Sequence, residues 1–118
     1  LSETSLREAN LTGANLAGAM MKGIFLTDSN LTEANLDQAI LIDAKLERAN
    51  LTEANLTRVN LAGANLTGGL LGKVRLLHAD LRRTRFNRAD LSRADLRQAN
   101  LTEATLIDAY LGRADLRG

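Results

Sequence analysis

Residues 46–66 read LERANLTEANLTRVNLAGANL, and this stretch carries the pattern that decides the fold of the 118-residue chain. A large apolar residue returns at every fifth position, a small residue lies two positions before it, and Asn or Asp often lies directly before it. The period begins at Leu1 and continues to Leu116 without an insertion. The whole chain is therefore one tandem array of five-residue repeats.

Neither an α-helix nor a flat strand can bury this pattern. The 24 central positions are all Leu except Met21 and Phe86. In a helix, five residues turn the side-chain direction by a net angle of about 140°, so the leucines would spiral around the axis. In a flat strand, an odd period sends successive leucines to opposite faces. Only a chain that bends once per repeat points every leucine inward, which predicts a solenoid with three or four sides per coil.

The positions around each leucine fit such a solenoid. The residue two before it is Ala in 16 of 23 repeats, and a small inward residue lets stacked coils interdigitate. The residue directly before it is Asn or Asp in 13 of 23 repeats, and these short side chains hydrogen-bond nearby backbone in turns. The other two positions are mostly polar or Gly, which indicates a solvated exterior with corners.

The chain resembles the pentapeptide-repeat family, whose motif is A(D/N)LXX. The motif appears here as Ala9-Asn10-Leu11, Ala34-Asn35-Leu36, Ala54-Asn55-Leu56, Ala89-Asp90-Leu91 and Ala94-Asp95-Leu96, among others. The resemblance covers essentially the whole chain. It implies an all-β fold, a right-handed quadrilateral β-helix with four pentapeptides per coil, and hence about six coils of 20 residues.

We expect residues 1–118 to form a single domain, with both ends of the stack uncapped. The core is predicted to lie on the solenoid axis, because no single coil encloses a core of its own. Its most secure members are Leu11, Leu31, Leu36, Leu51, Leu56, Leu61, Phe86, Leu91 and Leu96.

The composition excludes several classes of protein. Cys, Pro and Trp are absent, so the chain has no disulfide framework and no thiolate metal site. No apolar run is long enough for a membrane span or a signal-peptide core. The default expectation is a soluble cytoplasmic protein. Because the numbering starts at Leu1 and not at Met, an upstream signal for export or for an organelle lumen is also compatible with the sequence.

Residues 20–26 enlarge several positions of the repeat at once. In a 20-residue register Met20 lies beside Ile40, with Ile42 two residues further along that side and Phe25 around the next corner. These four side chains are the candidate interaction patch of the chain. The alternative is that they are scattered surface residues around an irregular corner.

Two other regions depart from the repeat. Residues 69–77 place Leu70 and Leu77 at nominally outward positions, and a local bulge is the favoured interpretation over a second contact patch. The ends of the stack expose unpaired backbone groups and leucines, which favours end-to-end association or indicates missing caps.

Charge is divided along the chain. Residues 1–60 carry 5 Lys/Arg against 8 Asp/Glu, whereas residues 61–118 carry 10 against 6. In a four-sided register the densest basic residues are spread over several sides, and only three aromatic residues are present, which disfavours direct nucleic-acid binding. These basic residues are Lys73, Arg75, Arg82, Arg83, Arg85, Arg88, Arg93 and Arg97.

Stacking at 20 residues is expected to place opposite charges side by side on the exterior. Exposed pairs of this kind contribute only about 0–1 kcal/mol each, so they serve register and solubility more than stability. The expected pairs are Asp28 with Arg48, Glu53 with Lys73, Arg83 with Glu103, and Arg88 with Asp108.

The residues needed for catalysis are too few. His78 is the sole histidine, and it lies at an outward position. Without cysteine or a second histidine, neither a nucleophile–His–acid site nor a His-rich metal site can form. Glu33 and Glu53 are neighbours in one column, but a solvated face is the favoured interpretation over a weak cation site. We expect no catalysis, cofactor, metal or small-molecule substrate.

The favoured function is a structural or protein-interaction module that binds a protein partner or a second copy of itself. Its precise biological role is not readable from the residues, and many members of the family it resembles occur in cyanobacteria and plastids. Some members imitate duplex DNA and regulate a topoisomerase such as DNA gyrase, which is the alternative. Mimicry requires a strongly negative surface, and a net charge of +1 disfavours it.

Overall fold

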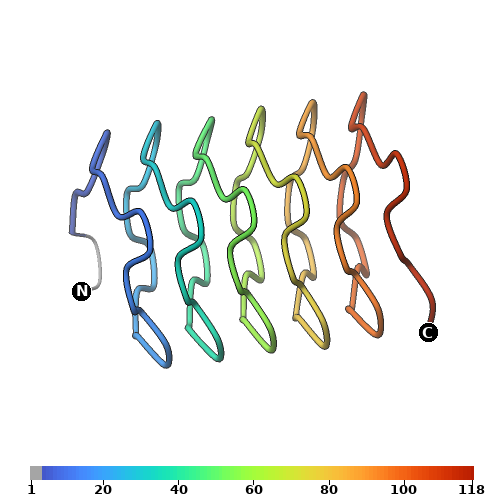
Figure 1. The fold of residues 1–118 in the computed structure, drawn as a ribbon, viewed down its shortest axis with the longest axis horizontal. Coiled ribbons are helices and arrows are strands. Elements are labelled where there is room, and N and C mark those ends of the chain that lie inside the picture. The colour runs from blue at the N-terminus through green and yellow to red at the C-terminus, as the bar shows by residue number, and fades with distance from the viewer. Residues whose placement is uncertain (1–3) are drawn as a thin grey trace.

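The chain winds into a stack of four-sided coils in a computed structural model, which describes residues 4–118 (Figure 1). Its β-bridges are single parallel pairs that join residues 20 positions apart, so each coil contains four pentapeptides. This 20-residue spacing shows that each coil has four sides and not three. We name the sides by their bridge residues, which begin with Ser5 for face A, Asn10 for face B, Asn15 for face C and Met20 for face D.

The stack has six levels, as the sequence predicts, with extents of 33 × 23 × 20 Å. Leu1 lies outside the described residues. Bridges occur singly along the described chain and merge into no longer strand, because a corner follows every three extended residues. We call the levels coil 1 (4–23), coil 2 (24–43), coil 3 (44–63), coil 4 (64–83), coil 5 (84–103) and coil 6 (104–118).

Backbone hydrogen bonds account for four of the five N–H groups in a repeat. In residues 31–35, Leu31 and Glu33 donate to carbonyls of the next coil at 2.7 and 3.0 Å. Asn35 donates to a carbonyl of the previous coil at 2.9 Å, and Ala34 closes the turn by donating to Leu31 at 3.0 Å. Because buried backbone groups must be paired, this pattern holds adjacent coils together along every side.

The fifth N–H explains the Asn or Asp that precedes the leucine in 13 of 23 repeats. The amide of Thr32 has no backbone acceptor in this pattern, and Asn30 Oδ1 accepts from it at 3.1 Å. The Thr32 hydroxyl also donates to this oxygen, at 2.6 Å. The same arrangement recurs at Asp90, which accepts from the amide of Ser92 at 2.8 Å. A short side-chain acceptor therefore completes the corner, as the sequence indicates.

The corners hold the backbone in the left-handed region. In the described corners, the residue two after each inward residue of the five-residue period has a positive φ, from +55° at Arg58 to +72° at Gly63, with +94° at Gly118. One positive φ at the third residue of a four-residue turn is the type II pattern, which glycine suits best. Most corners nevertheless carry Arg, Glu, Gln, Asp, Lys or His. This conformation costs an L-residue about 1–2 kcal/mol, which the ladder must offset.

The core is a column of leucines alternating with alanines. Eight of the nine inward residues named from the sequence are no more than 2% exposed, and Leu11 is half-buried. Leu11 differs because coil 1 has a described neighbour on one side only. Ser29 and Thr84 replace alanine in the interior, where their hydroxyls donate to the carbonyls of Leu26 and Leu61 at 2.6 and 2.9 Å.

The bulge expected within residues 69–77 is absent, and that expectation is wrong. Leu70 bridges face-B residues on both sides of it, and Gly69 closes its turn onto Leu66 at 3.0 Å like any other repeat. Leu70 stays outward and is 49% exposed, whereas Leu77 is half-buried. An outward apolar residue does not disturb the register, because the outer positions make few packing contacts.

Candidate interaction surface

Met20, Ile40 and Ile42 of the predicted interaction patch share face D and its corner with face A, Phe25 lies on face A, and the four residues are unequally exposed. Met20 and Ile40 bridge each other on face D, and Ile42 follows at the corner between faces D and A. Met20 is 69% exposed, whereas Phe25, Ile40 and Ile42 are half-buried. The patch is therefore an apolar surface on which Met20 is the one largely exposed side chain.

Phe25 lies on face A, where a charged group covers it. The guanidinium of Arg7 is 4.9 Å from the centroid of the Phe25 ring. Such cation–π contact stabilises a surface aromatic ring and shields one side of it from a partner. Phe25 consequently contributes less apolar surface than its size suggests.

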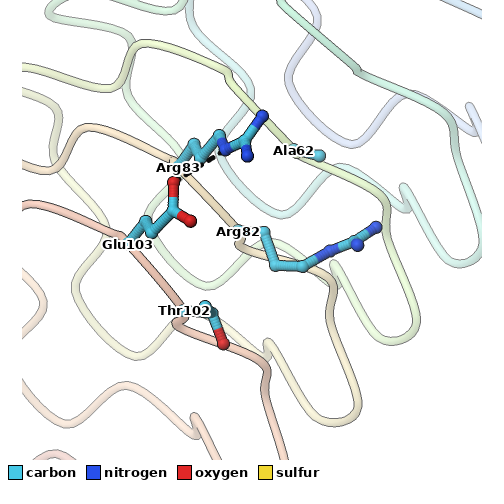
Figure 2. A pocket seen from close by; sticks show the side chains of 5 residues that line it. All are labelled: Ala62, Arg82, Arg83, Thr102 and Glu103. Atoms are coloured by element: carbon cyan, nitrogen blue, oxygen red, sulfur yellow. Dashed lines mark hydrogen bonds and ion pairs between the residues drawn. The ribbon is translucent and has the colours of Figure 1, made fainter.

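A hollow continues the patch towards the C-terminal half of the molecule. It has a volume of about 330 Å³ and is lined by Ala62, Arg82, Arg83, Thr102 and Glu103. Ala62 is one coil further along the column of Ile42, so the apolar patch and the hollow share the corner between faces D and A. Figure 2 shows Arg83 beside Glu103, while Arg82 extends away from Glu103.

The two arginines of the hollow are paired but retain unused donors. Arg82 binds Asp80 through Nε and Nη2 at 2.8 and 2.7 Å, and this contact lowers the pKa of the Asp80 carboxyl. Arg83 binds Glu103 through Nε at 2.8 Å. Within residues 4–118, Nη1 of Arg82 and both terminal nitrogens of Arg83 form no hydrogen bond. The hollow can therefore accept a further anion.

Three of the four expected pairs between coils form. Asp28 binds Arg48 in a bidentate contact at 2.7 and 2.6 Å, Lys73 binds Glu53 at 2.6 Å, and Arg83 binds Glu103. Arg88 and Asp108 share a column but form no ion pair among the described residues. Three further aspartates pair with the arginine two residues later, an arrangement that the sequence analysis missed: Asp80 with Arg82, Asp95 with Arg97, and Asp115 with Arg117.

The structure also exposes two large side chains that the sequence analysis did not single out. Ile107 is 65% exposed and Tyr110 is 63% exposed, both in coil 6. In the sequence, each of these two side chains is recognisable as an apolar or aromatic residue at a position of the repeat that is usually polar. Tyr110 occupies the place of Asn or Asp, and Ile107 occupies an outer position that is polar in most other repeats.

The titratable residues are dispersed. His78 is exposed at a corner between faces C and D. Across residues 4–118, His, Asp and Glu form no group of three that could hold a metal ion. Nowhere in that range does the chain form a helix of the length and apolarity that crossing a bilayer requires.

The family model for pentapeptide repeats matches eight copies, over residues 1–28, 29–68 and 79–118. The chain therefore belongs to the pentapeptide repeat family. The unmatched residues 69–78 contain the two outward leucines, yet their coil has the same geometry as the others. No curated protein matches the sequence.

Solved structures of pentapeptide repeat proteins share the right-handed quadrilateral β-helix. HetL from Nostoc sp. PCC 7120, a protein involved in heterocyst differentiation regulation, is 27% identical with a TM-score of 0.55, over 98% of this chain and 75% of that one. The protein alr5209 of Nostoc PCC 7120 is 28% identical with a TM-score of 0.56, over 92% and 85%. Rfr23 from Cyanothece 51142 is 23% identical with a TM-score of 0.50, over 98% and 89%, and supports the fold alone.

Proposed function

We propose that this chain is a non-catalytic protein-interaction module, a rigid rod that binds a segment of a partner protein along the corner between faces D and A. The observation that carries the proposal is the continuity of two unlike surfaces there. The apolar side chains of Met20, Ile40 and Ile42 adjoin a hollow that presents Arg82 and Arg83. Apolar anchors beside charged donors are a common composition for binding surfaces.

The geometry indicates the chemistry of the partner. Adjacent coils are about 4.8 Å apart, so Ile42 and Arg82, two coils apart in one column, are separated by about 10 Å along the rod. A partner segment would contact the patch with an apolar side chain and reach the arginines with a carboxylate. That separation spans about three residues of an extended segment or about two turns of a helix. An apolar residue followed by an acidic residue is the expected motif.

The alternatives fit the surface less well. Across residues 4–118, the outer carboxylates are dispersed over the sides of the rod, and neither hollow is lined by more than one of them. Imitation of duplex DNA requires a dense negative surface, whereas this chain carries a net charge of +1 and a basic C-terminal half. Binding of a protein segment uses the groups that are present.

A peptide-display selection on the purified chain tests the proposal. We expect selected peptides to combine an apolar residue with a following Asp or Glu. Their affinity should fall at least about tenfold in the double variant Met20→Lys/Ile42→Lys and in Arg83→Glu, because each removes one of the two contacts. Gln38→Lys, at the corner between faces C and D, is the matched control. Peptides that bind the double variant and Arg83→Glu as tightly as the parent chain would exclude this surface.

A further inference from the structure

The corner between faces B and C carries an ordered sequence of charges. Its charged members are acidic in the N-terminal half and basic in the C-terminal half, and the member in coil 1 is a neutral glycine. From coil 1 to coil 6 it reads Gly13, Glu33, Glu53, Lys73, Arg93, Arg113.

This order leaves like charges stacked on each other within one molecule. Lys73 pairs with Glu53 at 2.6 Å, but Glu33, Arg93 and Arg113 form no ion pair with any residue from 4 to 118. Neighbouring members of the column are about 4.8 Å apart, and like charges at that distance repel. The column is therefore incompletely neutralised in a single chain.

The adjoining face B is shaped for close approach. The residues next to the charged column are all small: Thr12, Thr32, Thr52, Gly72, Ser92 and Gly112. Leu70 and Tyr110 lie beside them and are 49% and 63% exposed. The Tyr110 ring lies over Gly112, where a Cβ would require the ring to move. A hollow of about 360 Å³ opens between Leu70, Lys73 and Arg93.

We propose that face B and its corner with face C bind a second copy of this chain, antiparallel and related by a two-fold axis between coils 3 and 4. Such an isologous interface places the same surface of each copy against the other. The axis exchanges coil 2 with coil 5 and coil 3 with coil 4. Glu33 then faces Arg93 of the second copy, and Glu53 faces Lys73.

Charge selects this register over its neighbours. In the proposed register each acidic residue of the column meets a basic one, and Arg113 meets the neutral Gly13. A shift by one coil in one direction places Lys73 against Lys73, and a shift in the other direction places Glu53 against Glu53. Like-charge contacts of this kind across an interface cost several kcal/mol. The shift that pairs Lys73 with Lys73 keeps Glu33 against Arg113 and Glu53 against Arg93, so the proposed register is distinguished as the one in which no like charges of the column meet.

The rest of the face is compatible with the same axis. Leu70 meets Asn50, and Tyr110 meets Asn10, so the exposed apolar groups lie against uncharged side chains. At the two-fold axis, the Glu53–Lys73 pairs of the two copies form one alternating network of four charges. Networks of ion pairs contribute more than isolated surface pairs.

No other corner has this property. In the corner between faces C and D, the corresponding column is Gly18, Gln38, Arg58, His78, Gln98 and Gly118, so Gln38 faces Gln98 and no acidic residue meets a basic one. The corner between faces A and B, which is the other border of face B, mixes the two signs: the same axis places Asp28 against Arg88 but also Glu8 against Asp108, which repel. The proposed interface also lies diagonally opposite the corner between faces D and A. The peptide-binding surface of the proposed function therefore remains exposed on each copy in the dimer.

The dimer is expected to be weak and sensitive to salt. The molecule is 33 Å long and 20–23 Å wide, so one face offers roughly 600 Å² per copy, below the value of about 800 Å² per partner of a standard interface. Much of the contact consists of exposed charges, which salt screens over about 10 Å at 0.1 M.

Sedimentation velocity on the 118-residue chain tests the proposal directly. Between about 1 and 500 µM in low salt we expect a reversible dimer, corresponding to a micromolar dissociation constant. Glu33→Arg and Arg93→Glu should each weaken it at least about tenfold, because each places two like-charge pairs in the interface. An equimolar mixture of the two variants should form a heterodimer, since all its Glu33–Arg93 contacts are again between opposite charges.

The controls are Gln38→Arg and Gln98→Glu, which change charge in the same two coils at left-handed corners with φ of +59° and +57°. They should leave the dimer unchanged. A chain that stays monomeric over the whole concentration range would overturn the proposal. So would a dimer that is indifferent to Glu33→Arg and Arg93→Glu, which would place self-association at the rod ends. Because no peptide is present, failure here leaves the proposed function standing.

Discussion

The two halves of the rod share one interior and differ in their exterior. Residues 1–60 carry 5 Lys/Arg and 8 Asp/Glu, whereas residues 61–118 carry 10 and 6. The leucines and the ladder are nevertheless the same in both halves. Charged side chains occupy corner and outer positions, where they do not contact the core. The comparison shows that the fold leaves the surface free to carry different charges.

Face C shows how the exterior differs at one position of the repeat. In the N-terminal half, Asn15, Asn35 and Asn55 form a ladder of side-chain hydrogen bonds at 3.3 and 3.2 Å. In the C-terminal half, Asp95 and Asp115 occupy equivalent places and Arg97 contacts both, at 2.7 and 3.8 Å. At these positions an oxygen acceptor completes the corner, and it can belong to either a neutral or an ionic network.

The largest expected effect tests whether the halves share one cooperative core. Leu56 and Leu76 are fully buried in the same column, one on each side of the boundary. Leu56→Asp and Leu76→Asp should each destabilise the chain by more than about 4 kcal/mol, because a buried carboxylate has no partner there. In both variants, the far-UV circular dichroism spectrum of the folded chain should be lost entirely.

The control for that experiment is His78→Asp, which adds a carboxylate at an exposed corner two residues from Leu76. Its spectrum and melting temperature should stay close to those of the parent. If Leu76→Asp retained half of the far-UV circular dichroism signal of the parent chain, the two halves would be independent units and not one stack.

An intermediate effect is expected at one pair of corners. Gly68 and Arg88 are adjacent in one column, with φ of +68° and +58°. A Cβ at Gly68 would make only an ordinary contact with Arg48, so strain in Gly68→Ala comes from the backbone alone. Gly68→Ala should lower the free energy of unfolding by about 1 kcal/mol, and Arg88→Gly should raise it by about 0.5 kcal/mol. Urea unfolding measures both, and a neutral Gly68→Ala would show that the corners are unstrained.

The smallest effect concerns the ionic network of the C-terminal half. Hydrogen bonds from Arg117 lower the pKa of Asp115 from 3.8 to about 2. A depressed carboxyl pKa contributes stability that is present above pH 3.8 and is lost as the pH falls through about 2. Arg117→Gln should return the pKa of Asp115 towards 3.8, as NMR titration of its carboxyl carbon would report. An unchanged pKa would assign the shift to other groups.

The interior of the molecule was predictable from the sequence because it is local. Each repeat closes its own turn, and its Asn or Asp completes its own corner. These contacts span only two or three residues, so a five-residue pattern is enough to predict them. The inward direction of Leu56 and the outward position of Glu33 follow from the period alone.

The surface depended on the tertiary structure because it is set by how many repeats close one coil. The period alone permits three sides or four, and only a coil of 20 residues places Glu53 against Lys73. The same closure places Ala62, one coil after Ile42, in the hollow with Arg82. The five-residue period determined which side chains are buried. The closure of the coil decided which exposed side chains are neighbours, because residues that are adjacent along a column are a full coil apart in sequence.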